Sequence, residues 1–155
     1  MDVLDIPDSD EIHVGFTGTR HGMTTDQERR VWWVLNDLKE RCPVIIGHHG
    51  DCLGADVQFD RMCLASGARV VVHPPTQGGV RARLPATDER SVLGAKSYMN
   101  RNRDIVRASD GLLATPCAPQ RGPSRGTWAT VRMASLAGLA VFVYEFDGTL
   151  YVPRS

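Results

Sequence analysis

The sequence predicts an α/β fold built on a doubly wound parallel sheet in three layers. Short apolar segments rich in Val, Ile and Phe alternate along the chain with longer segments of helical periodicity. The apolar segments are continuous, which is typical of parallel strands buried on both faces. Glycine and proline mark most of the boundaries between segments. We therefore expect a three-layer, Rossmann-like sheet with strand order 3-2-1-4-5 and a short C-terminal hairpin.

Three strands and two helices are expected in the first half of the chain: strands over residues 12–17, 44–47 and 69–73, and helices over residues 24–41 and 55–66. Thr25 and Glu28 match a capping box at the start of the first helix, and Pro43 ends this helix. Gly67 is the residue type that commonly follows a helix C-terminus.

The second half begins with the least regular segment, residues 74–94, whose length indicates a functional or mobile loop. In the helix that follows, Tyr98, Met99 and Ile105 lie on an apolar face, and Arg101 lies on the charged face. The remaining expected elements are a strand over 112–115, a helix over 127–137, a strand over 140–144 and a hairpin turn at 147–148.

Length and composition indicate one domain, residues 11–155, preceded by a polar arm over residues 1–10. Lys+Arg and Asp+Glu both number 18, and this zero net charge counts against a general DNA-coating or membrane-surface protein. No stretch reaches the ~20 apolar residues of a membrane span. The acidic start does not resemble a signal peptide, so we expect a cytoplasmic protein without a membrane partner.

No CxxC pair occurs among the four cysteines, Cys42, Cys52, Cys63 and Cys117. Free thiols in a reducing compartment are therefore expected. His48, His49 and Cys52 are close enough in sequence to suggest a metal, but no second ligand pair stands at zinc spacing. We favour ordinary loop and core roles for them, and we expect neither a metal nor a cofactor.

Three polar loops are expected at one edge of the sheet. In the order 3-2-1-4-5 the winding reverses between the first and fourth strands, and ligands bind there at the carboxyl ends of the strands. The loops after these two strands, residues 18–22 and 122–128, flank the crevice, and residues 47–56 follow the neighbouring second strand. The sequence therefore predicts one ligand site built from all three loops.

The residue types in these loops match a ligand that contains phosphate. Glycine-rich turns and helix N-termini present N–H groups to phosphate, and arginines pair with its oxygens. Asp51 and Asp56 are able to accept hydrogen bonds from ribose hydroxyls or base amino groups. The expected ligand-binding residues are Gly18, Thr19, Arg20, Gly50, Asp51, Asp56, Arg101, Gly122, Ser124, Arg125, Gly126 and Thr127.

Several polar and aromatic residues have a structural alternative. Asp56 is equally consistent with a charge at a helix N-terminus. Trp128 and Tyr98 are able to stack on a base, yet both also fit the hydrophobic core. The loop histidines are either polar loop residues or a source of a catalytic group: His21, His48 and His49.

Four segments, in the right order, resemble the SLOG superfamily: residues 15–20, 49–56, 100–106 and 126–128. This superfamily includes the Lonely Guy cytokinin-activating enzymes and DNA-processing protein A, and the resemblance spans residues 12–145. It implies a Rossmann-like fold that binds nucleotides, nucleotide-derived signals or nucleic acid. It also implies a homo-oligomer, a dimer or a tetramer.

Lonely Guy enzymes cleave the N-glycosidic bond of a nucleoside monophosphate with a PGGxGTxxE loop and an arginine from the preceding helix. Arg101 resembles that arginine, and Gly126 and Thr127 resemble the GT pair, whereas Thr130 stands where the family has glutamate. The resemblance implies a catalytic role for Arg101, and Asp51 is the first candidate for the missing carboxylate. Three other carboxylates are alternatives: Asp56, Glu89 and Asp104.

Three functions follow in order of preference. The first is binding of a nucleotide or nucleotide-derived ligand, in a sensor, sequestering or accessory role. The second is a nucleoside 5′-monophosphate N-glycoside hydrolase, against which the absent glutamate counts. The third is single-stranded DNA binding, against which zero net charge and the absence of a basic stripe in the sequence count.

Overall fold

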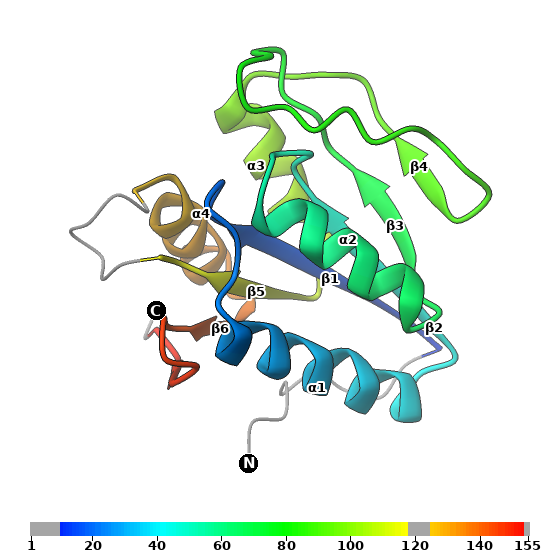
Figure 1. Cartoon of the computed structure of the whole chain (residues 1–155), viewed down its shortest axis with the longest axis vertical. Helices are drawn as coiled ribbons and strands as arrows, with labels where there is room; N and C mark the ends of the chain where they lie inside the picture. Colours follow the sequence, from blue (N-terminus) through cyan, green and yellow to red (C-terminus); the bar gives the residue numbers. More distant parts are fainter. Residues whose placement is uncertain (1–9, 118–124, 154–155) are drawn as a thin grey trace.

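The computed structural model describes residues 10–117 and 125–153, in which a seven-stranded sheet is flanked by helices (Figure 1). The strands are β1 (Glu11–Gly18), β2 (Val44–His49), β3 (Arg69–Val72), β4 (Arg90–Val92), β5 (Gly111–Thr115), β6 (Ala140–Tyr144) and β7 (Leu150–Tyr151). The helices are α1 (Thr25–Arg41), α2 (Ala55–Ala65), α3 (Tyr98–Ala108) and α4 (Arg125–Leu136). Among these described residues, no helix combines the length and apolar character needed to cross a membrane.

The predicted strand order is confirmed. The sheet runs β4-β3-β2-β1-β5-β6-β7, so the five expected parallel strands stand in the 3-2-1-4-5 arrangement. β7 pairs antiparallel with β6 and forms the expected C-terminal hairpin. β4 was not expected, because it lies in the irregular segment 74–94, where it adds a parallel strand beside β3. The winding therefore reverses between β1 and β5, as the sequence predicts.

Helices cover both faces of the sheet (Figure 1). α1 and α2 pack on one face, where Phe59 of α2 stacks on Phe16 of β1 with ring centroids 4.4 Å apart. α3 and α4 cover the other face, where Val106 and Trp128 join Leu112 in a second buried cluster. Central strands enclosed by helices on both sides bury most of their side chains, and all five residues of β5 are buried, which explains the continuous apolar sequence.

The start of α1 corrects the predicted capping box by one residue. Thr24, not Thr25, is the N-cap, and its hydroxyl accepts a hydrogen bond from the Gln27 amide at 3.1 Å. The Gln27 side chain in turn accepts from the Thr24 amide at 2.9 Å. Gln27 is buried, and its side-chain Nε2 also donates hydrogen bonds to the backbone carbonyls of Pro116 and Tyr144. These tertiary bonds select Gln27 as the third residue of the helix.

The orientation of α3 also differs from the prediction. Arg101 was predicted on the charged face of this helix and near the ligand site, and it is 6% exposed, whereas Met99 from the predicted apolar face is 64% exposed. Arg101 and Ile105 are four residues apart and therefore share the face that points to the sheet. The Arg101 guanidinium donates to two backbone carbonyls, of Gly50 and His73, and these bonds favour its burial.

A buried ionic network fastens β4 to the rest of the fold. The carboxylate of Asp60 in α2 accepts hydrogen bonds from His49 Nε2 at 2.8 Å and from Arg90 Nε at 2.9 Å, and a further one from Arg90 Nη2. Burial acts to raise the pKa of Asp60, but the hydrogen bonds from His49 and Arg90 outweigh it, so the pKa is lowered. One carboxylate thus ties together α2, β2 and β4.

Candidate functional site

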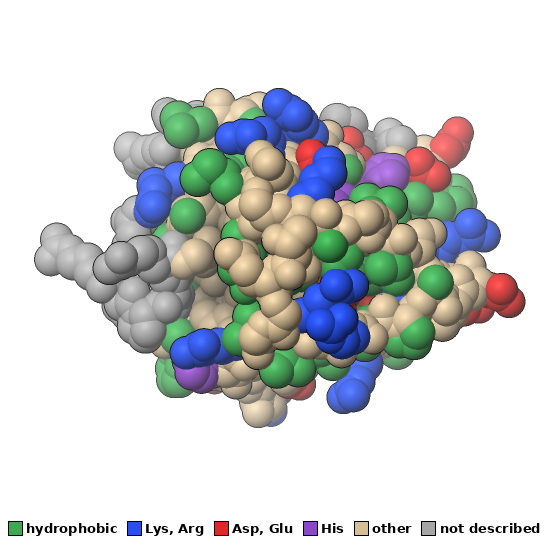
Figure 2. Space-filling view, turned by 90° about the horizontal axis from the view of Figure 1, so that it is seen from above, with side chains coloured by type: hydrophobic (Ala, Val, Ile, Leu, Met, Phe, Trp, Pro, Cys, Tyr) green, Lys and Arg blue, Asp and Glu red, His purple; other side chains and the backbone are tan. Residues whose placement is uncertain are grey.

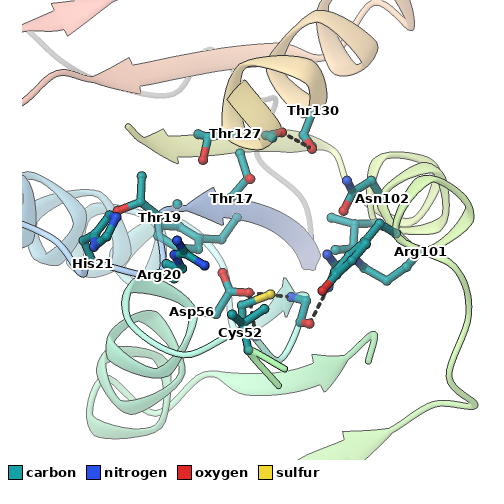
Figure 3. Close-up of a pocket in the computed structure, with 17 residues that line it drawn as sticks. Thr17, Thr19, Arg20, His21, Cys52, Asp56, Arg101, Asn102, Thr127 and Thr130 are labelled. Atoms are coloured by element: carbon teal, nitrogen blue, oxygen red, sulfur yellow. Dashed lines mark hydrogen bonds between the residues drawn. The ribbon is translucent and has the colours of Figure 1, made fainter. Parts of the chain in front are cut away.

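A cavity of about 460 Å³ lies at the carboxyl end of β1, where the winding reverses (Figure 3). Its wall combines the loop after β1, the loop after β2, one side of α3 and the start of α4. The lining residues are Phe16, Thr17, Gly18, Thr19, Arg20, His21, Gly50, Cys52, Asp56, Val80, Tyr98, Arg101, Asn102, Ile105, Gly126, Thr127 and Thr130.

Most of the predicted ligand-binding residues meet in this cavity: Gly18, Thr19, Arg20, Gly50, Asp56, Arg101, Gly126 and Thr127. Gly122, Ser124 and the side chain of Arg125 lie outside the described residues. Asp51 is described but does not line the cavity. The loop convergence expected from the strand order is therefore present in space.

The loop after β1 is held against the start of α2. A Cβ atom on Gly18 would lie 2.5 Å from Ala55 Cβ, so only glycine fits this position. The Thr19 carbonyl accepts hydrogen bonds from the amides of Ala55 and Gly22 at 3.0 and 3.1 Å. Thr19 is 7% exposed, and its buried hydroxyl has no hydrogen-bond partner among the described residues. Arg20 follows on the cavity wall.

The side chain of Arg101 extends from α3 to the cavity, where backbone carbonyl groups bind its guanidinium. Its Nη1 donates to the Gly50 carbonyl and, at 3.4 Å, to the His73 carbonyl, and its guanidinium carbon lies 5.3 Å from the Tyr98 ring centroid. A Cβ on Gly50 would lie 2.0 Å from Nη1, so this glycine makes room for the guanidinium. Arg101 Nε is buried without a hydrogen-bond partner among the described residues. The arrangement positions a desolvated cation at the cavity wall.

Asp56 is the carboxylate of this cavity. Its Oδ2 accepts hydrogen bonds from the amides of Gly50 and Cys52, both at 3.1 Å, and its other oxygen faces the cavity (Figure 3). Burial raises the pKa of Asp56, and the positive charge of Arg101 offsets this only in part. Burial and the Asp56 carboxylate likewise raise the pKa of the neighbouring Cys52 thiol. The site therefore favours a protonatable carboxyl and a neutral thiol.

The start of α4 forms the wall opposite Asp56 (Figure 3). Thr127 is 5% exposed, and a Cβ on Gly126 would meet no atom within 4 Å, so the backbone there is open to a ligand. Thr130 donates from its hydroxyl to the Gly126 carbonyl at 3.3 Å. The N–H groups of a helix's first turn have no partner within the helix, and they favour an anion.

No family model matches the chain, and no curated protein matches it. Solved structures do match. The structural-genomics target TM1055 aligns over 84% of this chain and 72% of its own, with TM-score 0.58 and 14% identity. The molybdenum cofactor binding protein of the phototrophic bacterium Rippkaea orientalis aligns over 87% and 77%, with TM-score 0.62 and 17% identity.

DNA processing protein A from Helicobacter pylori, solved for its single-stranded DNA binding mode, aligns over 90% of this chain and 66% of its own. The TM-score is 0.56 and the identity 19%. The present chain has a Rossmann-like fold like that of these three structures. At these identities the likeness defines the fold alone.

Thr130, which stands where the sequence resemblance implies a glutamate, lies on the cavity wall. Its hydroxyl is bonded to the backbone of its own helix. Of the four carboxylates considered as replacements, Asp56 alone lines the cavity: Glu89 is exposed, and Asp104 pairs with Lys96 at 2.6 Å outside it. Any carboxylate chemistry in this cavity therefore rests on Asp56.

Asp51 has a structural position next to the cavity. It is fully buried in a left-handed backbone conformation with φ 59°. Its carboxylate accepts hydrogen bonds from the amides of Arg83 and Leu84 at 3.2 and 3.1 Å and from Arg81 Nε at 3.1 Å. The geometry thus gives no support to Asp51 as a catalytic or ligand-binding residue. It holds the segment around residues 81–84 against the loop after β2.

Some residues had both a ligand-binding and a structural interpretation in the sequence, and the structure places some of them at the cavity and others in the core. Trp128 is 3% exposed, belongs to the core beneath α4 and does not line the cavity. Tyr98 and His21 line the cavity instead. His48 and His49 are buried, His48 bonded to two other histidines and His49 to Asp60. Neither of these two buried histidines reaches the cavity.

Thr17, Asn102 and Val80 are among the lining residues that were not expected. Thr17 follows His13 and Gly15 at strand spacing on β1, and this polar face was a signal that sequence reasoning missed. Asn102 neighbours Arg101 on α3, so the burial of Arg101 carries Asn102 to the cavity edge. Val80 comes from the segment 74–94, whose path depends on tertiary contacts such as those of Asp51, and nothing in its local sequence indicates its position.

Proposed function

We propose that this cavity binds a nucleotide or a nucleotide-derived ligand, in a sensor, sequestering or accessory role. The observation that carries the proposal is Arg101, a buried guanidinium at the cavity wall opposite the N-terminal turn of α4. A buried cation is costly without an anionic partner, and the α4 amides favour the same kind of partner. The described residues offer Arg101 no carboxylate within ion-pair distance. A ligand phosphate would satisfy both groups.

The remaining lining residues fit the rest of such a ligand. The Asp56 oxygen that faces the cavity is able to accept a hydrogen bond from a ribose hydroxyl or a base amino group. Tyr98 and Ile105 offer apolar surface for a base on the α3 side. Thr19, whose hydroxyl has no described partner, adds a further polar group.

Gly50→Ala is expected to abolish ligand binding, because the added Cβ would lie 2.0 Å from Arg101 Nη1 and displace the guanidinium. The measurement is a thermal shift with AMP, GMP, CMP and UMP, together with mass spectrometry of small molecules released from the purified protein. A ligand at 100 times its Kd stabilises the fold by about 2.7 kcal/mol. Wild-type protein should shift with at least one nucleotide, and Gly50→Ala should not.

Gly79→Ala is the matched control, because a Cβ there meets no atom within 4 Å. It should keep the wild-type shift. Thr127→Val serves as a second test of the same cavity in case Gly50→Ala fails to fold. An unchanged shift in both cavity variants would place the ligand elsewhere. No shift with any nucleotide and no co-purified small molecule would overturn the proposal.

A second candidate function, nucleoside monophosphate N-glycoside hydrolysis, is favoured by Asp56. In this reaction water attacks the C1′ carbon and passes a proton to the Asp56 carboxylate, while the C1′–N bond breaks. The electron pair goes to the base nitrogen, which takes a proton from solvent, and the products are free base and ribose 5-phosphate. Arg101 would hold the phosphate during the reaction.

If the protein is such a hydrolase, Asp56→Asn should lower base release by about 100-fold or more, the effect typical of a lost acid–base group. Chromatography of free base released from the four nucleoside monophosphates measures it. Asp88→Asn is the matched control, because Asp88 is exposed and outside the cavity. No base release by the wild-type protein would exclude hydrolysis of these nucleotides and leave the binding proposal intact.

Single-stranded DNA binding has weaker support. Figure 2 shows lysine and arginine side chains in separate groups on the face that it displays, with apolar and neutral surface between them. A DNA path requires a continuous basic track. We also infer a cytoplasmic homo-oligomer, for which Met99 on α3 and Leu136 on α4 offer exposed apolar surface.

A further inference from the structure

A second cavity of about 340 Å³ lies on the other side of Arg101. Its walls come from the end of β3, the segment before α3, and α3 itself: His73, Leu93, Gly94, Ala95, Lys96, Arg101 and Asp104. Apart from Arg101, none of these residues lines the main cavity. The second cavity is therefore a separate space that shares one guanidinium with the proposed nucleotide site.

A chain of hydrogen-bonded imidazoles crosses the sheet beneath α3 and ends at this cavity. Glu11 Oε2 lies 2.8 Å from His13 Nε2, and His13 Nδ1 lies 2.8 Å from His48 Nε2. His48 Nδ1 then lies 2.9 Å from His73 Nε2. β1, β2 and β3 are neighbours, so each supplies or precedes one imidazole of the chain. Glu11 is half exposed, whereas His48 and His73 are buried.

The carboxylate at one end fixes the tautomer of every ring. An ionised carboxylate only accepts, so His13 carries a proton on Nε2, and when the ring is neutral its Nδ1 is bare. His48 must then donate from Nε2, and its bare Nδ1 accepts from His73 Nε2. Burial lowers the pKa of His48 to about 3 and of His73 to about 4, so both rings stay neutral. The last ring, His73, is left with an unprotonated Nδ1, which is a hydrogen-bond acceptor.

The charges around His73 make the second cavity cationic. Arg101 and Lys96 are positive and Asp104 is negative, and Lys96 Nζ pairs with Asp104 at 2.6 Å. His73 lines the same cavity as these three charged groups. The cavity therefore carries one net positive charge together with a neutral acceptor nitrogen.

We propose that the second cavity binds a small oxyanion that retains one proton, such as monohydrogen phosphate. The anion pairs with Arg101 and Lys96, and its hydroxyl donates to His73 Nδ1. An oxyanion without a proton would set a lone pair against the bare nitrogen and leave both unsatisfied. Glu11, at the far end of the chain, acts as a positioning residue for this acceptor. The proposal shares Arg101 with the proposed nucleotide site, whereas Lys96 and His73 line the second cavity alone.

Phosphate and sulfate are the matched probes, because they have similar size and charge, and at about pH 8 phosphate keeps a proton while sulfate keeps none. Isothermal titration calorimetry of the full chain should give about tenfold tighter binding of phosphate, the difference made by one unsatisfied buried acceptor. Glu11→Gln should erase this preference, since an amide is able to donate as well as accept and no longer fixes the chain. Lys96→Gln should weaken both anions.

Thr127→Val, in the main cavity, should leave the preference for phosphate over sulfate unchanged, because that preference depends on His73. Nitrogen-15 NMR of the imidazoles should show His73 protonated on Nε2 in wild-type protein and a mixture of tautomers in Glu11→Gln. Equal affinity for phosphate and sulfate in wild-type protein would overturn the proposal, as would a proton on His73 Nδ1. Loss of phosphate binding in Thr127→Val with no change in Lys96→Gln would assign the anion to the main cavity, which also overturns it.

Discussion

Replacing Asp60 with alanine is expected to lower the free energy of unfolding by about 3–5 kcal/mol, the effect typical of removing one partner from a buried ion pair. Asp60 and His49 have no exposed surface, and Arg90 is 9% exposed. The substitution would leave the Arg90 guanidinium buried without its carboxylate, and it would remove the acceptor of His49 Nε2. The interactions lost are those that join α2, β2 and β4.

Urea unfolding monitored by circular dichroism measures this effect. Arg29→Ala is the matched control, because Arg29 and Asp26 form an exposed pair on α1 at 3.5 Å. Such surface pairs contribute about 0–1 kcal/mol, so the control should stay close to wild type. A change below about 1 kcal/mol for Asp60→Ala would mean that the network is replaced by water or neighbouring groups and does not hold β4.

The strand order and the loop convergence could be predicted because both depend on local patterns. Continuous apolar strands alternating with periodic helices restrict the topology to few arrangements, and in these the loops after the first, second and fourth strands meet. Gly18 and Gly50 were predicted as site residues from their positions in these loops. The reason for glycine at position 50, however, follows only from the three-dimensional structure. Gly50 makes room for an arginine that is distant in sequence.

Long-range polar contacts could not be predicted, since their partners lie far apart in the chain. Arg101 was predicted as a site residue on the charged face of its helix, but its burial depends on two backbone carbonyls 28 and 51 residues away. Asp51 looked like a site residue because it sits in a polar loop, yet it binds amides 32 and 33 residues away. β4 likewise depends on Arg90 finding Asp60. Each of these contacts joins residues that are distant in the sequence.

Acid is expected to destabilise the fold well above the pH at which carboxylates titrate. An unfolded histidine takes up a proton near pH 6.5, whereas the lowered pKa values of folded His48 and His73 are about 3 and 4. Between these limits each proton binds the unfolded chain only, so stability present at neutral pH is lost as the pH falls. The slope is about 1.4 kcal/mol per pH unit for each histidine, or about 3 kcal/mol for the pair from pH 6.5 to 5.

The titratable groups around the imidazole chain determine which variants isolate the contribution of the histidines to the pH dependence of stability. Burial dominates the shift of His48, reinforced by His73 and His13, whereas for His73 the Asp104 carboxylate opposes burial. Asp60, with its lowered pKa, contributes stability that is lost only below the ordinary carboxyl range, outside the window from pH 6.5 to 5. Asp56 works in the opposite sense, because its raised pKa lets the folded state take up a proton first.

Urea unfolding of wild-type protein, His48→Asn and Asp56→Asn between pH 7.5 and 5 tests the sign of each contribution. His48→Asn should be less stable than wild type at pH 7.5, since it breaks the imidazole chain, but its stability should fall by about 1.4 kcal/mol less per pH unit below pH 6.5. The free energy of unfolding of Asp56→Asn should fall at least as steeply with decreasing pH as that of wild type. If the free energy of unfolding of His48→Asn fell with pH in parallel with that of wild type, folded His48 would have to take up a proton in this range. The hydrogen-bonded chain of neutral imidazoles that ends at His73 does not allow this.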